Sequence, residues 1–217
     1  MKITLIVLMV LALGMTGSTI YLWSDGQDAE KKIENLDLKI QTMGDALNQS
    51  ESLMAQEVEK VKLSYDSLLQ DLRKEIDQGQ VKIKMVESKL SISIVDKVLF
   101  PSGKANISKE GEQILNRVGG VLKNSIGKII RVEGHTDNVP IHPKLQKTYA
   151  TNWDLSSARA SNIVKYLNEK ANIPGKKLRA VGMGSYHPVA KNSTAKGRKW
   201  NRRVEIILIP DPKYKEK

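Results

Sequence analysis

The sequence predicts an α+β domain in the C-terminal half of the chain, preceded by a transmembrane helix and a coiled-coil segment. Three observations lead to this fold class. An uncharged apolar run lies near the N-terminus, apolar residues then recur at helical spacing up to residue 90, and strand-like and helix-like patterns alternate after Ser91. We therefore divide the chain into an anchor (1–25), a helical spacer (26–90), the α+β domain (91–210) and a basic tail (211–217).

The composition excludes several kinds of chemistry. The 217 residues include no cysteine, so disulfides, thiolate metal sites and cysteine nucleophiles are ruled out. The formal net charge of +11 favours polyanionic surroundings, namely nucleic acid, anionic lipid or an acidic wall polymer, and does not choose among them.

Residues 3–23 predict a transmembrane helix. They carry no charge, and a helix of this length spans about 30 Å, the thickness of the hydrocarbon core. Tyr21 and Trp23 lie at one end, where aromatic rings favour the membrane interface, and Lys2 at the other end predicts an N-terminus on the inside. A cleaved signal peptide is the alternative, although no A-x-A-like cleavage site is present. In both cases the rest of the chain is exported.

Residues 33–90 have the apolar periodicity of a coiled coil, with two four-residue insertions that unwind it locally. The "QGQ" at residues 78–80 predicts a break in the helix. We expect a spacer that pairs as a homodimer, and the alternative is a single amphipathic helix that packs on its own domain. The three apolar registers are Ile33, Leu36, Ile40, Met43, Leu47 and Met54; Val58, Val61, Tyr65, Leu68 and Leu72; and Ile76, Ile83, Val86 and Leu90.

Beyond Ser91 the pattern predicts the element order β-α-β-α-β-β, with the helices packed on the sheet as an α+β sandwich. The helix after Ser108 has that residue as its N-cap, and Asp154 or Ser156 is expected to cap the second helix. A long basic loop is expected before the last strand. The predicted strands are 91–95, 128–135, 177–184 and 202–209, the helices 108–125 and 154–171, and the basic loop 185–201.

Asp137 and Arg159 carry opposite charges that one pocket could use. Asp137 follows a predicted strand, and Arg159 lies in the first turns of the next helix, whose N-terminus carries free N–H groups and partial positive charge. A ligand with one ammonium and one carboxylate would pair with Asp137 and Arg159 respectively, through charge-assisted hydrogen bonds. The plainer alternatives are a loop aspartate that binds backbone amides and a surface arginine paired with a local acid.

Four separated motifs resemble the OmpA-like peptidoglycan-binding domain, which is shared by outer-membrane anchors, Pal-type lipoproteins and MotB-type stator subunits. The motifs are "EGHTDN", "NWDLSSARA", "VGMGSYHP" and "GRKWNRRVEI"; they occur in the family's order and cover about residues 91–210. The tryptophan of "NWDLS" and the long loop before it are more similar to the MotB branch. The resemblance implies that Asp137 and Arg159 grip the diaminopimelate of the wall stem peptide, in a pocket also lined by Thr136, Asn152 and Arg202.

No catalysis, cofactor or metal is expected. The sequence offers no nucleophile with a base and no G-x-S-x-G motif. His135 and Asp137 form an H-x-D pair, but a third ligand is not evident, and we expect His135 to pack structurally.

These observations predict a non-catalytic single-pass protein of the cell inner membrane, whose periplasmic domain tethers the membrane, or a membrane complex, to peptidoglycan. A MotB-like stator subunit is the first alternative, although residues 3–23 contain no ionisable side chain to carry protons. An exported structural coiled-coil scaffold is the second. Nucleic acid is not expected as a partner, because the domain is exported and basic loops suit an acidic glycan.

Overall fold

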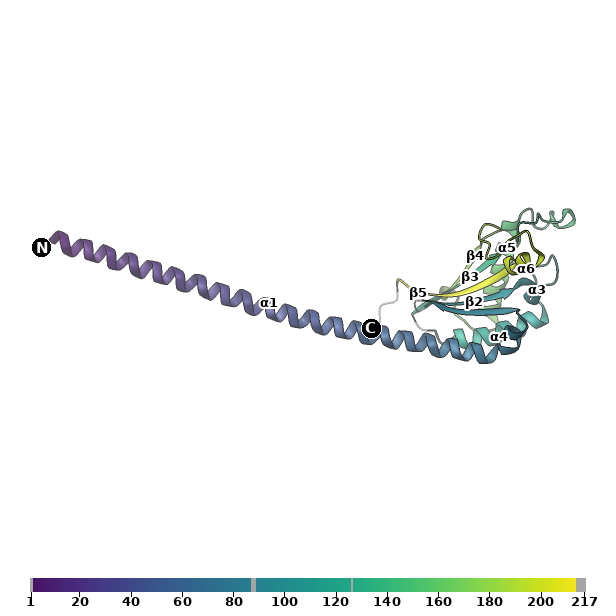
Figure 1. Cartoon of the computed structure of the whole chain (residues 1–217), viewed down its shortest axis with the longest axis horizontal. Helices are drawn as coiled ribbons and strands as arrows, with labels where there is room; N and C mark the ends of the chain where they lie inside the picture. The colour runs from purple at the N-terminus through teal and green to yellow at the C-terminus, as the bar shows by residue number, and fades with distance from the viewer. Residues whose placement is uncertain (1, 87–88, 126, 214–217) are drawn as a thin grey trace. The chain divides into compact units, whose positions relative to one another are not determined.

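The computed structural model describes residues 2–86, 89–125 and 127–213 (Figure 1). Within this range, the side chains of residues 2–26, 28, 29 and 86 lie outside the description. The chain divides into two units, residues 1–56 and 57–217, and each is described here by itself.

The first unit is the N-terminal part of helix α1 (Lys2–Asp71), and residues 57–71 of this helix belong to the second unit. The side chains of the predicted transmembrane segment, residues 3–23, lie outside the described residues. In the part that is described, no helix is long and apolar enough to cross a membrane. The first predicted apolar register is exposed, and burying such a stripe against another helix is what stabilises a coiled coil. Its exposed members are Ile33, Leu36, Ile40, Met43, Leu47 and Met54.

Most of the second register has a different environment, because it packs on the domain of its own chain, although its first member, Val58, is exposed. Val61, Leu68 and Leu72 are buried in the core of the second unit, and Tyr65 packs against that core. The alternative of a helix packed on its own domain is therefore confirmed for the last turns of α1, whereas homodimer pairing stays a prediction for residues 33–54. The last turns of α1 form part of the domain, whereas the stripe at residues 33–54 is left exposed.

Residues 81–90 were predicted to end the helical spacer, and this prediction is wrong. After α1, the short helix α2 (Arg73–Asp77) leads to Gly79, which turns the chain with a φ of +62°. The antiparallel strands β1 (Val81–Val86) and β2 (Lys89–Val95) follow. Apolar and charged residues alternate in "VKIK" at residues 81–84, and this period of two is typical of a strand with one buried face.

The sheet has five strands in the order β1-β2-β5-β3-β4, with β3 (Lys128–His135), β4 (Leu178–Gly182) and β5 (Arg203–Pro210). Only β3 and β4 are parallel, and β5, the last strand in the sequence, lies in the middle of the sheet. The predicted order of strands and helices is confirmed, with β1 as an additional strand at the edge.

Helices α4 (Lys109–Leu122) and α5 (Asn152–Glu169) contribute to one apolar core with the sheet. Core residues alternate along the strands, as in Ile92 and Ile94 of β2 and Val204 and Ile206 of β5. Ser108 caps α4 as predicted, because its hydroxyl accepts from the N–H of Gly111 at 3.0 Å. The short helix α6 (Ala195–Asn201) lies within the stretch predicted as a basic loop.

The predicted cap of α5 is wrong, since Thr151 is the N-cap rather than Asp154 or Ser156. The backbone N–H of Thr151 donates to Oδ2 of Asp154 at 2.8 Å, and the Thr151 side chain accepts from the N–H of Asp154. This reciprocal capping box lowers the pKa of Asp154, chiefly through its hydrogen bond with the Thr151 hydroxyl. The helix therefore begins two residues earlier than the sequence pattern indicated.

Three strand ends meet at one edge of the sheet. Because β5 is antiparallel to both β2 and β3, Val95 and His135 both pair with Arg203. The ends of β2 and β3 and the start of β5 therefore lie next to one another. Helix α5 closely approaches the same edge, since a Cβ on Gly134 would lie 2.2 Å from the carbonyl oxygen of Ser156. This contact brings the side chains of α5 next to the strand ends.

Candidate functional site

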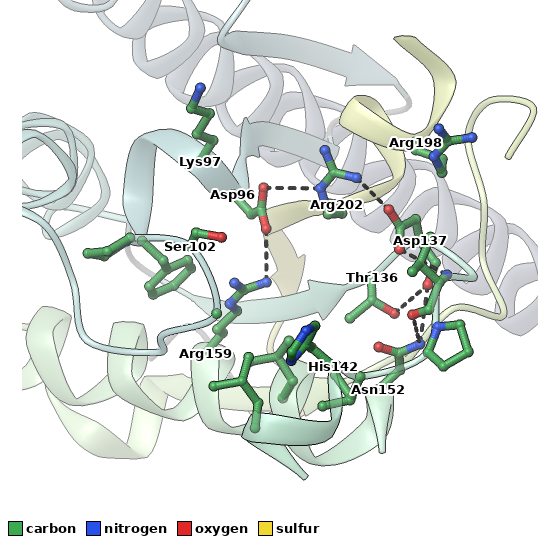
Figure 2. Close-up of a pocket in the computed structure, with 18 residues that line it drawn as sticks. Asp96, Lys97, Ser102, Thr136, Asp137, His142, Asn152, Arg159, Arg198 and Arg202 are labelled. Carbon is green, nitrogen blue, oxygen red and sulfur yellow. Dashed lines mark hydrogen bonds and ion pairs between the residues drawn. The ribbon is translucent and has the colours of Figure 1, made fainter. Parts of the chain in front are cut away.

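Two arginines and two aspartates alternate in a row at this edge, in the order Arg159, Asp96, Arg202, Asp137 (Figure 2). Arg159 extends from α5, and Asp96 is the first residue of α3 (Asp96–Leu99), directly after β2. Arg202 precedes β5 and Asp137 follows β3. The backbone N–H of Asp96 also donates to the carbonyl of Arg202 at 3.0 Å, so the row is held by the main chain as well.

Arg159 and Asp96 form a buried ion pair. Nη1 of Arg159 lies 2.9 Å from Oδ2 of Asp96, and Nε donates to the carbonyl of Lys104 at 3.2 Å. Burial raises the pKa of Asp96, while Arg159 and Arg202 act in the opposite direction; burial likewise lowers the pKa of Arg159, against the effect of Asp96. The ring of Phe100 lies 5.1 Å from Cζ of Arg159 and adds a cation–π contact.

Asp137 uses both oxygens of its buried carboxylate. Oδ1 accepts from the backbone N–H of Val139 at 3.1 Å, and Oδ2 pairs with Nη1 of Arg202. The side chain of Arg202 is 40% exposed, against 9% or less for the other three members of the row, and its Nε lies 3.8 Å from Oδ1 of Asp96. Arg202 therefore keeps the most contact with solvent of the four side chains.

Thr136 and Asn152 hold the loop that carries Asp137. The hydroxyl of Thr136 donates to the carbonyl of Asp137 at 2.9 Å. The side-chain amide of Asn152 donates to the carbonyl of Val139 at 3.1 Å and contacts that of Asp137 at 3.4 Å. Because Asn152 opens the capped helix α5, the helix start fixes the position of the acidic loop.

A cavity of about 660 Å³ lies among these residues. Its lining includes six charged side chains, of which four are basic and two acidic: Lys97, Arg159, Arg198 and Arg202, and Asp96 and Asp137. The cavity therefore has an excess of two positive charges and also offers carboxylates. A small ligand that carries an ammonium and more than one carboxylate would match this distribution.

All five residues singled out from the sequence line this one cavity: Thr136, Asp137, Asn152, Arg159 and Arg202. The plainer alternatives for Asp137 and Arg159 also hold in part, since Asp137 accepts from a backbone amide and Arg159 pairs with an acid. That acid, Asp96, was missed. It stands directly after an alternating strand, as Asp137 nearly does, and this shared position was the available signal.

A second charged cluster involves Glu133, His135 and Glu205, whose ligand atoms lie within 4.8 Å of one another. This cluster does not include Asp137 and is therefore distinct from the His135–Asp137 pair seen in the sequence; it forms because the pairing of β3 with β5 places Glu205 opposite Glu133. Each carboxylate already has a guanidinium partner, Arg131 at 2.7 Å from Glu133 and Arg203 at 2.6 Å from Glu205. These cations oppose the binding of a metal ion there. The imidazole of His135, whose Nε2 lies 3.5 Å from Oε2 of Glu133, is the main cause of the lowered pKa of Glu133.

The fold is that of a known protein family. The OmpA family matches residues 99–202, which contain Asp137, Arg159 and Arg202 together with β3 and α5. The chain belongs to the OmpA family, through the domain that forms its C-terminal half.

Three similar proteins show the range of this family. Motility protein B of Bacillus subtilis (strain 168) is 37% identical over 155 residues, which cover 71% of this chain and 57% of that protein. Peptidoglycan-binding protein ArfA of Mycobacterium tuberculosis (strain ATCC 25618 / H37Rv) is 33% identical over 111 residues, covering 51% of this chain and 32% of that protein. The solved structure of the cell wall anchor of the T6SS from Pseudomonas aeruginosa is 32% identical with a TM-score of 0.59, covering 66% of this chain and 97% of that one. The chain thus spans less than two thirds of the length of either curated relative.

Proposed function

We propose that this chain is a non-catalytic envelope protein that binds peptidoglycan by holding the diaminopimelate of the stem peptide in the charged cavity. The observation that carries the proposal is the row of alternating charges that lines the cavity. Similarity to a peptidoglycan-binding protein and to a cell wall anchor supports it.

The row suggests how a zwitterion is taken up. The free end of diaminopimelate carries an ammonium and a carboxylate on the same carbon. The ammonium replaces the guanidinium of Arg202 on Asp137, and the carboxylate is received by Arg159 and the released Arg202. Each exchange keeps opposite charges in contact, so that no buried group loses its partner. The partial exposure of Arg202 makes it the group that moves.

Competition for purified wall tests the proposal. In a pull-down of the full chain with intact peptidoglycan, we expect a stem tripeptide ending in meso-diaminopimelate to displace the protein. A tripeptide ending in lysine carries the ammonium without the adjacent carboxylate, and we expect it to compete at least tenfold more weakly, since a charge-assisted hydrogen bond contributes about 1.5–3 kcal/mol. Equal competition by the two tripeptides, or release of muropeptides from the wall, would refute the proposal.

We also propose that residues 3–23 anchor the chain as a single pass in the cell inner membrane, with the OmpA domain in the periplasm. The absence of a charge in this stretch and its length support the anchor. Recovery of the chain with its original N-terminus from the membrane fraction is the expected result. Recovery of a shortened chain in the soluble fraction would show a cleaved signal peptide instead.

The exposed stripe of α1 supports a homodimer formed through residues 33–54. The chain has no cysteine, so single cysteines can report on this contact. We expect Leu47→Cys, on the stripe, to form a disulfide-linked dimer under mild oxidation. Gln49→Cys, about 200° away around the helix, is the matched control and is expected to stay monomeric on a denaturing gel. Equal cross-linking at both positions would contradict a specific coiled coil.

Similarity to Motility protein B favours a second candidate, a stator subunit of an ion-driven motor. Residues 3–23 contain no Asp, Glu, His, Lys or Arg that could carry a proton across the membrane. We therefore propose a tether, which can serve another membrane complex, rather than an ion carrier. Ion flux through membranes that contain only this protein would reverse the choice.

A further inference from the structure

Two aromatic side chains form an exposed stacked pair beside the charged cavity. Trp153 is 45% exposed and Tyr186 is 68% exposed, with ring centroids 5.3 Å apart and ring planes inclined by 23°. Trp153 directly follows Asn152, which lines the cavity, and Tyr186 belongs to the loop after β4. Neither ring enters the core, so their packing does not explain why two large aromatic side chains face water at this place.

A buried hydrogen-bond relay fixes the aromatic pair relative to the cavity. The hydroxyl of Ser156, which is fully buried, donates to the carbonyl of Trp153 at 3.0 Å and accepts from the N–H of Gly184 at 3.1 Å. The carbonyl of Gly184 accepts from the N–H of Thr136 at 2.8 Å, and Thr136 precedes Asp137. The helix start, the loop after β4 and the acidic loop are thus joined into one hydrogen-bonded structure.

Gly184 lets the indole ring lie close to the backbone of the loop. Its φ is +55°, and a Cβ at this position would lie 3.2 Å from Cδ2 of Trp153. The aromatic pair is therefore held by its surroundings before any ligand arrives. Rigid aromatic side chains provide contact area at a low cost in conformational entropy, which favours binding.

We propose that Trp153 and Tyr186 form a subsite for a sugar ring of the peptidoglycan glycan strand. The inference rests on the proposed function, because the stem peptide in the cavity is covalently attached to the glycan and brings a sugar close to it. A pyranose ring presents a face of C–H groups that complements the electron-rich face of an aromatic ring. The indole N–H and the phenol hydroxyl can bond with sugar hydroxyls.

Two ligands and three variants of the full chain test the subsite by calorimetry. The ligands are a stem tripeptide ending in meso-diaminopimelate and the same tripeptide attached to its disaccharide. We expect the wild type to bind the disaccharide-tripeptide more tightly than the tripeptide. Trp153→Ala and Tyr186→Ala should bind the disaccharide-tripeptide about three- to tenfold more weakly, the effect of one lost aromatic contact, and the free tripeptide unchanged. Val189→Ala removes an exposed apolar group from the same loop and should leave both affinities unchanged.

Three results would overturn the subsite. The first is a wild type that does not distinguish the two ligands. The second is a Trp153→Ala variant that keeps the wild-type preference for the disaccharide-tripeptide, which would indicate that the aromatic pair binds a protein partner instead. The third is an equal loss for both ligands, which would indicate a structural role. In each of these cases the tripeptide still binds the wild type, so the proposed function stands; failure of the wild type to bind the tripeptide would refute both.

Discussion

Replacement of Arg159 by alanine is expected to lower the free energy of unfolding by about 3–5 kcal/mol, because it leaves the buried carboxylate of Asp96 without its nearest partner. Arg202 lies 3.8 Å from that carboxylate and compensates only in part. Urea denaturation of the full chain measures the effect as a lower midpoint with an unchanged m-value. Lys165→Ala, at an exposed position of the same helix, is the matched control and should change the midpoint little.

A double variant separates the buried charge from the lost packing of Arg159. Asp96→Asn in the Arg159→Ala background removes the uncompensated carboxylate and should recover a large part of the stability. The pH dependence of stability provides a second test. Because burial raises the pKa of Asp96, the ionised carboxylate lowers the free energy of unfolding at pH values above that pKa. This destabilisation disappears as the pH falls through the pKa and the carboxylate is protonated. The loss caused by Arg159→Ala should therefore shrink in acid. An Arg159→Ala variant as stable as the wild type at neutral pH would show that the ion pair contributes nothing to the fold.

Because Arg159→Ala is expected to destabilise the domain, ligand binding in the cavity has to be tested with a different substitution. From the sequence alone, Arg159→Ala looks like a clean loss of ligand binding in a folded domain. The structure shows that the same substitution disturbs a buried pair, so weaker wall binding by that variant would mix two causes. Asp137→Asn avoids the difficulty, since the amide keeps an oxygen for the N–H of Val139 and frees only the partly exposed Arg202.

The sequence predicted the class of fold and two of the residues that line the cavity, because these depend on local signals. Period-two alternation and helical spacing identified the strands β2 to β5 and the helices α4 and α5. The charges at a strand end and on the following helix identified Asp137 and Arg159, and the resemblance to the OmpA family added Thr136, Asn152 and Arg202, which also line the cavity.

The remaining features depend on tertiary contacts that a local pattern does not contain. Val61, Leu68 and Leu72 repeat as a coiled coil does, yet they are buried by the domain of their own chain. The position of Ile83 is compatible with a helical register and with strand alternation. In the folded protein it pairs with Ile92 of β2, so the segment is a strand. Asp96 is 63 residues from Arg159 in the sequence, so the folded sheet alone reveals the pair.

Asp137→Asn is expected to weaken binding of the diaminopimelate tripeptide by about 10- to 100-fold, the effect of one lost charge-assisted hydrogen bond. The physical reason is that a neutral amide cannot receive the ligand ammonium as the carboxylate does. The change in stability should be small, because Arg202 regains hydration when its partner loses charge. Calorimetry measures the affinity, and urea denaturation of the same samples confirms the fold. Asn138→Ala, at an exposed position of the same loop, is the matched control and should bind as the wild type does.

A comparison of two ligands by wild type and Asp137→Asn tests the zwitterion site most directly. One ligand is the diaminopimelate tripeptide, and the other is the same tripeptide with 2-aminopimelate, which lacks only the side-chain ammonium. The wild type should prefer the first by about tenfold or more, and the variant should bind both alike. If the variant keeps the full preference, or the wild type shows none, then Asp137 does not receive the ammonium and the cavity does not recognise diaminopimelate in this way.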